Sequence, residues 1–174
     1  MLRNKLFLIM VILFSCLKLP ISYNTNISKK VSNFNEHIAL LEIPKINLYG
    51  KLYEKNSPLN DVDKNLMIIG DMPSENGKFI IAGHSGVGDV SYFNDLVYLN
   101  INDKINIYYN NKIYEYVIFD IYDIEKTGKL YLNKNENNII ILVTCKIGTD
   151  KQTIYKGILK DIDNYVNENF DLIR

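Results

Sequence analysis

Short apolar runs separated by polar, turn-forming segments recur along the chain from about residue 38 onward. The runs at 79–84 and 138–145 are nearly continuous and rich in β-branched residues, which is typical of strands buried on both faces. Residues 104–109 and 112–120 flank Asn110-Asn111, a favourable hairpin turn. With the other runs, this pattern predicts roughly eight short strands and little helix, as in a β-barrel or a sandwich.

Three further segments are less regular. Pro44 interrupts the apolar run 38–48, which predicts an edge strand or a kinked strand there. Residues 91–96 can form one or two helical turns, with Asp89 or Ser91 as the cap. Residues 161–174 form an acidic tail that we expect to be frayed or helical.

The N-terminus has the layout of a signal peptide or signal anchor, with Arg3 and Lys5 before an apolar run. We therefore divide the chain into an anchor (1–23), a polar linker (24–36), a folded domain (37–160) and the tail (161–174). The apolar run is short for a membrane span of roughly 20 residues, unless Lys18 snorkels.

The basic flank predicts that the N-terminus lies inside the cell and that the domain lies outside. No small-residue cleavage site is obvious in this segment, so an uncleaved anchor is favoured over a removed signal. Lipidation at Cys16 is a third interpretation, although Phe14 stands where a small residue is expected.

Composition narrows the function classes. Lys+Arg and Asp+Glu are both 20, and this balance argues against nucleic acid as the main partner. No spacing of potential ligands matches a zinc site or a calcium loop, so we predict neither a metal nor a cofactor. We expect several acidic residues to be solvated surface groups: Asp61, Asp63, Glu75, Asp123 and Glu125.

Two of the buried runs end in residues suited to nucleophilic catalysis, His84 and Cys145. A thiol with a pKa of about 8.5 is only a few per cent thiolate at neutral pH. A histidine nearby raises that fraction or supplies a proton to a leaving group. The plainer interpretation is a buried cysteine and a hydrogen-bonded surface histidine. His37, beside Glu36, is expected to be solvated.

Several segments resemble the sortases, which are membrane-anchored cysteine transpeptidases of Gram-positive-type bacteria. The segments occur in the family's order: Leu40-Leu41-Glu42-Ile43-Pro44-Lys45, Ala82-Gly83-His84-Ser85-Gly86, Phe93-Asn94-Asp95-Leu96 and Ile141-Leu142-Val143-Thr144-Cys145. Ile141 stands where the family has its first threonine. The sequence has no large insertion before the cysteine strand, and in this respect it resembles sortases of class A and class D more than those of class B.

The resemblance implies an eight-stranded β-barrel with short helices and a groove at one end. It implies that Cys145 attacks an LPxTG-like sorting signal after its threonine and that His84 protonates the departing amine. An amine of a cell-wall precursor or a pilin lysine then accepts the acyl group. Ser85 and Thr144 are the implied substrate-binding residues. The expected location is the outer face of the cell membrane.

The family also uses an arginine on the strand after the cysteine, and here this sequence departs from it. The matching position holds Gln152, or Lys151 if the alignment shifts by one residue, and the only arginines are Arg3 and Arg174. Successive residues of a strand face opposite ways, so only one of the two can serve, and we favour Gln152. Glutamine can donate hydrogen bonds to an oxyanion but carries no charge.

Two alternatives remain open beside an active transpeptidase. One is a catalytically impaired sortase-like barrel that binds peptides at the cell surface. The other is a different wall-linked cysteine enzyme, which ranks low: papain-like amidases have the cysteine before the histidine, and L,D-transpeptidases carry a His-Gly-Cys segment that Val143-Thr144-Cys145 lacks.

Overall fold

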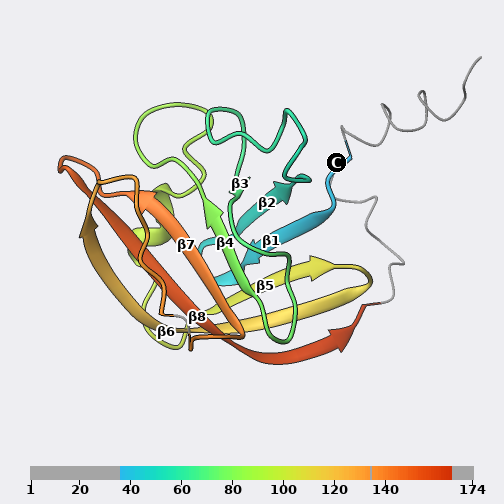
Figure 1. The fold of residues 1–174 in the computed structure, drawn as a ribbon. Coiled ribbons are helices and arrows are strands. Elements are labelled where there is room, and N and C mark those ends of the chain that lie inside the picture. Colours follow the sequence, from blue (N-terminus) through green and yellow to red (C-terminus); the bar gives the residue numbers. More distant parts are fainter. Residues whose placement is uncertain (1–35, 134, 166–174) are drawn as a thin grey trace, which may run out of the picture. The chain divides into compact units, whose positions relative to one another are not determined.

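The computed structural model describes residues 36–133 and 135–165. They form one eight-stranded sheet, in the order β2-β1-β5-β6-β8-β7-β4-β3, that curls into a nearly closed barrel (Figure 1). The strands are β1 (Ala39–Ile43), β2 (Leu48–Leu52), β3 (Met67–Ile68), β4 (Lys78–Ala82), β5 (Lys104–Tyr109), β6 (Lys112–Glu125), β7 (Ile139–Cys145) and β8 (Lys151–Asn164). The structure therefore confirms a mostly-β barrel and decides against a sandwich.

Local sequence explains the end of β1 and the turn between β5 and β6. β1 stops at Ile43 because Pro44 follows, and Pro44–Ile46 form the short 3-10 helix η1 before β2 begins. The hairpin between β5 and β6 turns at Asn110 and Asn111, whose φ angles are 49° and 58°. Both residues are left-handed, which suits a two-residue hairpin turn and matches the Asn-Asn prediction.

All neighbouring strands are antiparallel except β4 and β7, which run side by side in the same direction (Figure 1). A parallel pair needs a long crossover connection. In this chain the connection contains β5, β6 and the second 3-10 helix, η2 (Asn94–Tyr98). The crossover brings two segments about sixty residues apart in sequence to the same edge of the sheet.

Apolar side chains pack on both faces of the β4-β7-β8 part of the sheet. The larger cluster fills the barrel and includes Phe79, Leu142 and Tyr155. The smaller cluster lies on the opposite face and consists of Ile80, Ile139, Ile141, Val143 and Ile154. The two clusters explain why β7 is a continuous apolar run, since each face of it is buried.

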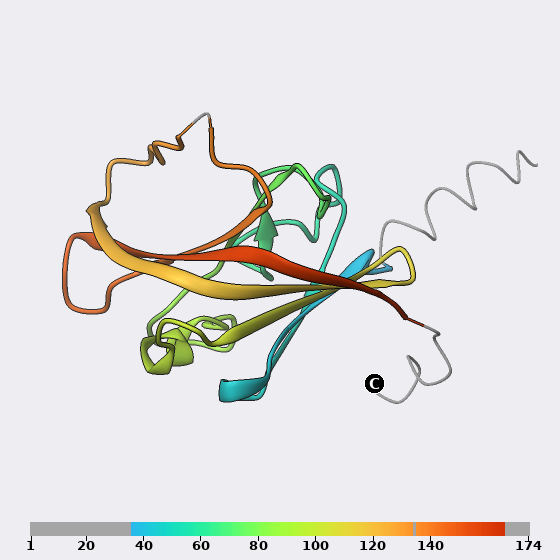
Figure 2. The same ribbon diagram turned by 90° about the horizontal axis from the view of Figure 1, so that it is seen from below.

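The β6–β7 connection covers the smaller cluster. Leu130 and Leu132 of this connection pack against it. Figure 2 shows the connection on one side of the β6-β8 layer and η2 on the other side. The sheet thus has a covered outer face as well as a barrel interior, and each borders a cleft.

Two of the predicted local structures are wrong. The helical turns begin later, at Asn94, and the N-cap is Phe93, which makes no side-chain cap bond. Neither Asp89 nor Ser91 is therefore the cap. Ser91 lies in the turn before the helix, where its backbone carbonyl accepts a hydrogen bond from the Asn94 N–H at 3.3 Å. β8 also continues to Asn164, so the start of the predicted tail is strand, paired with β6.

Candidate active site

His84 and Cys145 come together because β4 and β7 are parallel neighbours. The register pairs Ala82 with Val143, and the Gly83 N–H extends the pairing by donating to the Val143 carbonyl at 3.1 Å. Two residues beyond Ala82 and Val143 lie His84 and Cys145. Since parallel strands present their carboxyl ends at one edge, the imidazole and the thiol share that edge.

Close packing holds the backbone just before His84. A Cβ atom at Gly83 would lie 2.7 Å from Leu66 Cδ2 and 2.8 Å from Phe93 Cδ2, so any other residue would force these two buried side chains to shift. The Phe93 N–H donates to the His84 carbonyl at 2.9 Å. The buried Thr144 hydroxyl donates to the Gly83 carbonyl at 2.9 Å, which ties β7 to β4. The main chain at His84 is thereby fixed relative to Cys145.

Gln152 lies directly across from Cys145 on β8, and Ile124 of β6 lies across from Gln152. Directly opposed residues point to the same face of a sheet. Cys145, Gln152 and Ile124 therefore form a row across three strands on the face of the smaller apolar cluster, and His84, two residues past the end of β4, extends the row. The Gln152 side chain makes no hydrogen bond to any other residue that the structure describes.

Lys151 points to the other face of β8, as side-chain alternation requires. It pairs across the strands with Glu125, and its Nζ lies 3.8 Å from Glu125 Oε1. The structure thus places Gln152, and not Lys151, beside Cys145. This arrangement agrees with the preference for Gln152 at the position of the family's arginine, and it leaves the role of Gln152 to be tested.

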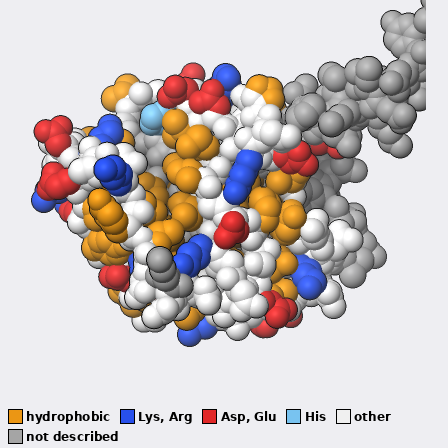
Figure 3. All heavy atoms as spheres, in the orientation of Figure 1, with side chains coloured by type: hydrophobic (Ala, Val, Ile, Leu, Met, Phe, Trp, Pro, Cys, Tyr) orange, Lys and Arg blue, Asp and Glu red, His pale blue; other side chains and the backbone are white. Residues whose placement is uncertain are grey.

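One cleft joins the three predicted catalytic residues, and we call it the histidine cleft. It has a volume of about 520 Å³ and is lined by His84, Cys145 and Gln152. Apolar side chains from β3 and the residue after it, from β4 and β7, and from the β6–β7 connection supply much of the remaining wall: Met67, Ile69, Ile80, Val143, Leu130 and Leu132. Figure 3 shows apolar side chains gathered on the face where β4 and β7 lie, with lysine side chains at their border.

Asp63 contacts the catalytic candidate His84, which the sequence did not predict. His84 Nε2 lies 2.9 Å from Asp63 Oδ1, and the Asp63 side chain is 80% exposed. With Nε2 engaged by the carboxylate, Nδ1 is the ring nitrogen left to exchange a proton with a substrate. The expectation that Asp63 is a solvated surface residue is therefore incomplete, because this carboxylate also orients the imidazole.

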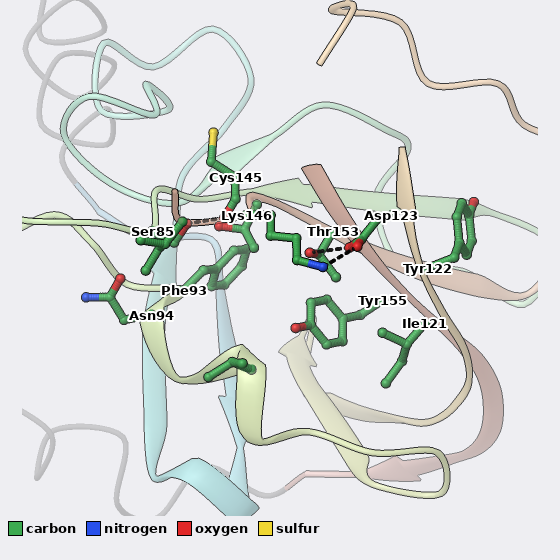
Figure 4. Close-up of a pocket in the computed structure, with 13 residues that line it drawn as sticks. Ser85, Phe93, Asn94, Ile121, Tyr122, Asp123, Cys145, Lys146, Thr153 and Tyr155 are labelled. Atoms are coloured by element: carbon green, nitrogen blue, oxygen red, sulfur yellow. Dashed lines mark hydrogen bonds and ion pairs between the residues drawn. The ribbon is translucent and has the colours of Figure 1, made fainter. Parts of the chain in front are cut away.

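A second cleft meets Cys145 from the opposite side, and we call it the aspartate cleft. Its volume is about 500 Å³, and it shares only Thr144 and Cys145 with the histidine cleft. Its other polar lining is Ser85, Asn94, Asp123, Lys146 and Thr153. Figure 4 shows the Cys145 sulfur pointing away from the Asp123, Tyr155 and Phe93 side chains of this cleft.

The charged groups of the aspartate cleft bind one another. Lys146 Nζ lies 2.5 Å from Asp123 Oδ2, and the Thr153 hydroxyl donates to Asp123 Oδ1 at 2.9 Å. These hydrogen bonds, with that of Lys146 first, lower the pKa of Asp123. Burial raises the pKa of Tyr155, so its phenol stays neutral. Asp123 is thus ionised and fully engaged at neutral pH.

Ser85, predicted to bind substrate, lies at the rim of the aspartate cleft. Its hydroxyl donates to the Cys145 carbonyl in a short hydrogen bond. The next residue, Gly86, exchanges two hydrogen bonds with the Asn94 side chain, at 2.6 and 3.0 Å. The other predicted substrate contact, Thr144, has its hydroxyl on the Gly83 carbonyl, as described above. In this structure both hydroxyls hold backbone segments around the thiol.

The β6–β7 connection forms a wall of the histidine cleft that the sequence did not reveal. Lys156 is 7% exposed, and its Nζ lies 2.7 Å from both carboxylate oxygens of Glu136. Lys78 Nζ donates to the Asn133 carbonyl at 2.7 Å. Two lysines of the sheet therefore hold the connection against it. Residues 130–138 read only as polar and turn-rich, so no local signal indicated this role.

The described residues contain no group of three or more His, Cys, Asp or Glu side chains that could hold a metal ion. Within the same residues, no helix is both long and apolar enough to cross a bilayer. The predicted anchor (1–23) lies outside the described residues, as does the linker (24–36) except for Glu36. The Cys145 thiol is free.

Comparison with known proteins defines the family. A sortase domain model matches residues 41–158. Among solved structures, sortase D5 from Clostridium perfringens, described as a transpeptidase, is 28% identical, with a TM-score of 0.61 over 80% of this chain and 91% of that one. Sortase A from Corynebacterium diphtheriae, as a lid mutant, is 21% identical, with a TM-score of 0.63 over 74% and 72%.

Sortase C-3 from Streptococcus pneumoniae is 20% identical, with a TM-score of 0.65 over 79% of this chain and 69% of that one. No curated protein sequence matches the chain. The family match covers more than half of the sequence and includes His84, Cys145 and Gln152. The chain belongs to the sortase family, whose members are cysteine transpeptidases.

Proposed function

We propose that this protein cleaves an LPxTG-like sorting signal after its threonine and transfers the acyl group to an amine. The observation that carries the proposal is the row formed by His84, Cys145 and Gln152 at the edge of one apolar cleft. An extended peptide laid along that edge would present its carbonyl to the thiol. The related structures include sortases A, C and D, so a class A or D character stays a prediction.

In the first step, the Cys145 thiolate attacks the threonine carbonyl carbon. The C–N bond to the following glycine breaks, and protonated His84 gives its proton to the departing amine. The product is a thioester on Cys145. Asp63 would keep the imidazole oriented during this transfer, through its contact with Nε2.

In the second step, an amine attacks the thioester carbonyl and neutral His84 takes the proton that the amine loses. The amide forms, and the Cys145 thiolate leaves. We propose a cell-wall precursor or a pilin lysine as the acceptor. The first product leaves before the amine binds to the thioester intermediate, so the kinetics would be ping-pong.

Gln152 would donate its side-chain N–H groups to the oxyanion of each tetrahedral intermediate. Its position directly across from Cys145 supports this role. A neutral amide stabilises an oxyanion less than a guanidinium, since charge-assisted hydrogen bonds are roughly twice as strong. We therefore expect slow but real turnover.

We also propose that residues 1–23 anchor the protein in the cell membrane of a Gram-positive-type bacterium, with the barrel on the outer face. The basic start and apolar run of this segment support the orientation. Ser85 and Thr144 would contact the substrate near the thiol only as hydrogen-bond acceptors, because each hydroxyl already donates to a backbone carbonyl.

The test is cleavage of fluorogenic LPxTG-type peptides by the purified full-length protein, with and without an added amine. Turnover that shifts to an amide product with the amine, and falls by more than about 10³-fold in Cys145→Ala, would establish the transpeptidase. Absence of both turnover and a thioester adduct at Cys145 would contradict it.

That negative result would favour the second candidate, an impaired barrel that binds peptides at the cell surface. One observation motivates this candidate: no arginine occurs between Arg3 and Arg174. Measuring peptide affinity and turnover on the parent protein separates the two candidates, because a binding module would bind the peptide without cleaving it. A parent protein that neither binds nor cleaves the peptide would contradict both.

A further inference from the structure

The lining of the histidine cleft carries an excess of positive charge. Besides His84, its ionisable residues are Cys145, Lys126 and Lys129, and no aspartate or glutamate lines it. The whole chain, in contrast, has equal numbers of acidic and basic residues. A local cationic excess in a neutral protein indicates a preference for an anionic ligand at that place.

A tight turn after β6 presents both lysines. The Thr127 N–H donates to the Glu125 carbonyl at 2.8 Å, and Gly128 has a φ of 70° with open space around it. The Lys126 N–H donates to the Asp150 carbonyl at 3.1 Å, which ties the turn to the start of β8. The backbone that carries the two side chains is thus held in place.

Lys126 points to the same face as the catalytic row. It lies two residues after Ile124, which is opposite Gln152, which in turn is opposite Cys145. Two strand spacings, about 10 Å, separate Ile124 from Cys145. A side chain one or two residues from the scissile bond of an extended peptide, at about 3.4 Å per residue, can span such a distance.

The two lysines are not neutralised within the protein. Neither Lys126 nor Lys129 has a side-chain hydrogen bond or ion pair among the described residues. Three acidic groups of this region have other partners: Asp63 contacts His84, Glu136 holds the buried Lys156, and Glu125 faces Lys151 on the other side of the strand pair. The ammonium groups therefore remain for a ligand.

We propose that Lys126 and Lys129 form a carboxylate-binding subsite of the histidine cleft, which selects sorting signals with Asp or Glu at the variable position of LPxTG. The inference rests on the proposed function and names the substrate class of the same site. The apolar wall of the cleft takes the apolar residues of the signal, and only x is free to carry charge. Each exposed lysine contributes about two- to fivefold in selectivity.

The first experiment needs no turnover. In the full-length protein with Cys16→Ser, Cys145 is the only thiol, and its alkylation rates with iodoacetate and iodoacetamide are compared. The ratio of the anionic to the neutral reagent cancels the reactivity of the thiolate itself. We expect this ratio to fall three- to tenfold in Lys126→Gln/Lys129→Gln, and to fall similarly in the parent protein at 1 M salt.

Two controls separate charge from fold. The ratio stays at the parent value in Lys160→Gln, where an exposed lysine at the far end of β8 is lost. It is restored in Lys126→Arg/Lys129→Arg, which keeps both charges. An unchanged ratio in the double glutamine variant would overturn the subsite.

The second experiment compares kcat/KM for peptides with Glu, Gln or Lys at x. We expect kcat/KM to be highest for the Glu peptide, intermediate for Gln and lowest for Lys. The roughly tenfold difference between the Glu and Lys peptides should disappear in the double glutamine variant. Turnover of all three peptides at equal rates overturns the inference and leaves the transpeptidase intact. If no peptide is cleaved, the proposed function fails, and the alkylation ratio decides alone whether the cleft prefers anions.

Discussion

Two clefts of similar volume reach Cys145 from opposite faces of the sheet, and they differ in what their polar groups do. In the aspartate cleft, Asp123, Lys146 and Thr153 bind one another. In the histidine cleft, the Gln152 amide and the ammonium groups of Lys126 and Lys129 have no partner among the described residues. A polar group already paired within the protein has little left to offer a ligand.

The difference indicates that one face holds the thiol in position and the other presents it. The backbone around Cys145 is fixed from the aspartate side, by the Ser85 hydroxyl on its carbonyl. The sulfur itself points the other way (Figure 4). Substitutions in the histidine cleft should therefore reduce chemistry, and those in the aspartate cleft should mainly reduce stability.

Apart from loss of the thiol itself, the largest effect is expected at His84. Replacing it with alanine removes the group that transfers the proton, and kcat/KM should fall by about 10² to 10⁴ in the peptide assay. Asp63→Asn keeps the size of the side chain and should lower kcat only a few-fold, because this carboxylate is largely exposed. If kcat/KM falls by less than about threefold in His84→Ala, the histidine cleft would not be the one that carries the chemistry.

Gln152 and Lys151 provide a matched pair on one strand. Gln152→Ala removes the donor across from Cys145 and should lower kcat by about 10- to 100-fold, whereas Lys151→Ala should stay within about twofold. Gln152→Arg should raise kcat, since a guanidinium binds an oxyanion more strongly. An unchanged rate in Gln152→Arg would count against any role for this position.

Glu136→Gln tests what holds the wall of the histidine cleft. Lys156 is buried, so removing its carboxylate partner should lower the free energy of unfolding by about 2 kcal/mol. Amide hydrogen exchange in residues 126–133 should rise as the connection loosens. Glu115→Gln is the control, because its partner Lys104 is 57% exposed and the pair contributes less than about 1 kcal/mol. Equal losses of unfolding free energy in the two variants would show that the burial of Lys156 does not strengthen its ion pair.

The smallest effect is expected at Asp123, and it depends on pH. The hydrogen bond from Lys146 lowers the pKa of Asp123 in the folded protein. The stabilisation is therefore present above the ordinary value near 3.9 and is lost as pH falls through the lowered pKa.

Asp123→Asn should cost less than about 1 kcal/mol at pH 7, because the pair is partly exposed, and less at a low pH where the carboxylate takes up a proton. Urea unfolding at the two pH values measures this difference. A pH-independent loss would mean that the ion pair does not contribute.

Much of the site follows from local sequence. The β-branched runs predicted the strands that end near His84 and at Cys145, and period-two alternation placed Gln152 and Lys151 on opposite faces. The Asn110-Asn111 turn followed from the tolerance of asparagine for left-handed backbone. Asp63 and Lys126 gave no such signal, since a charged residue in a polar loop reads as solvated surface wherever the loop goes.

The sequence by itself determined which segments are strands and which residues carry the chemistry, because these properties depend on neighbours along the chain. It did not determine every strand end, since β6 and β8 run beyond their predicted bounds. The tertiary structure decided which ends meet. The parallel pairing of β4 with β7 joins His84 to Cys145, the Lys156–Glu136 ion pair holds the connection that walls their cleft, and the Asp150 carbonyl ties down the turn that carries Lys126. Such contacts join residues far apart in sequence, and their geometry is set by strand register and burial in the whole barrel rather than by any local pattern.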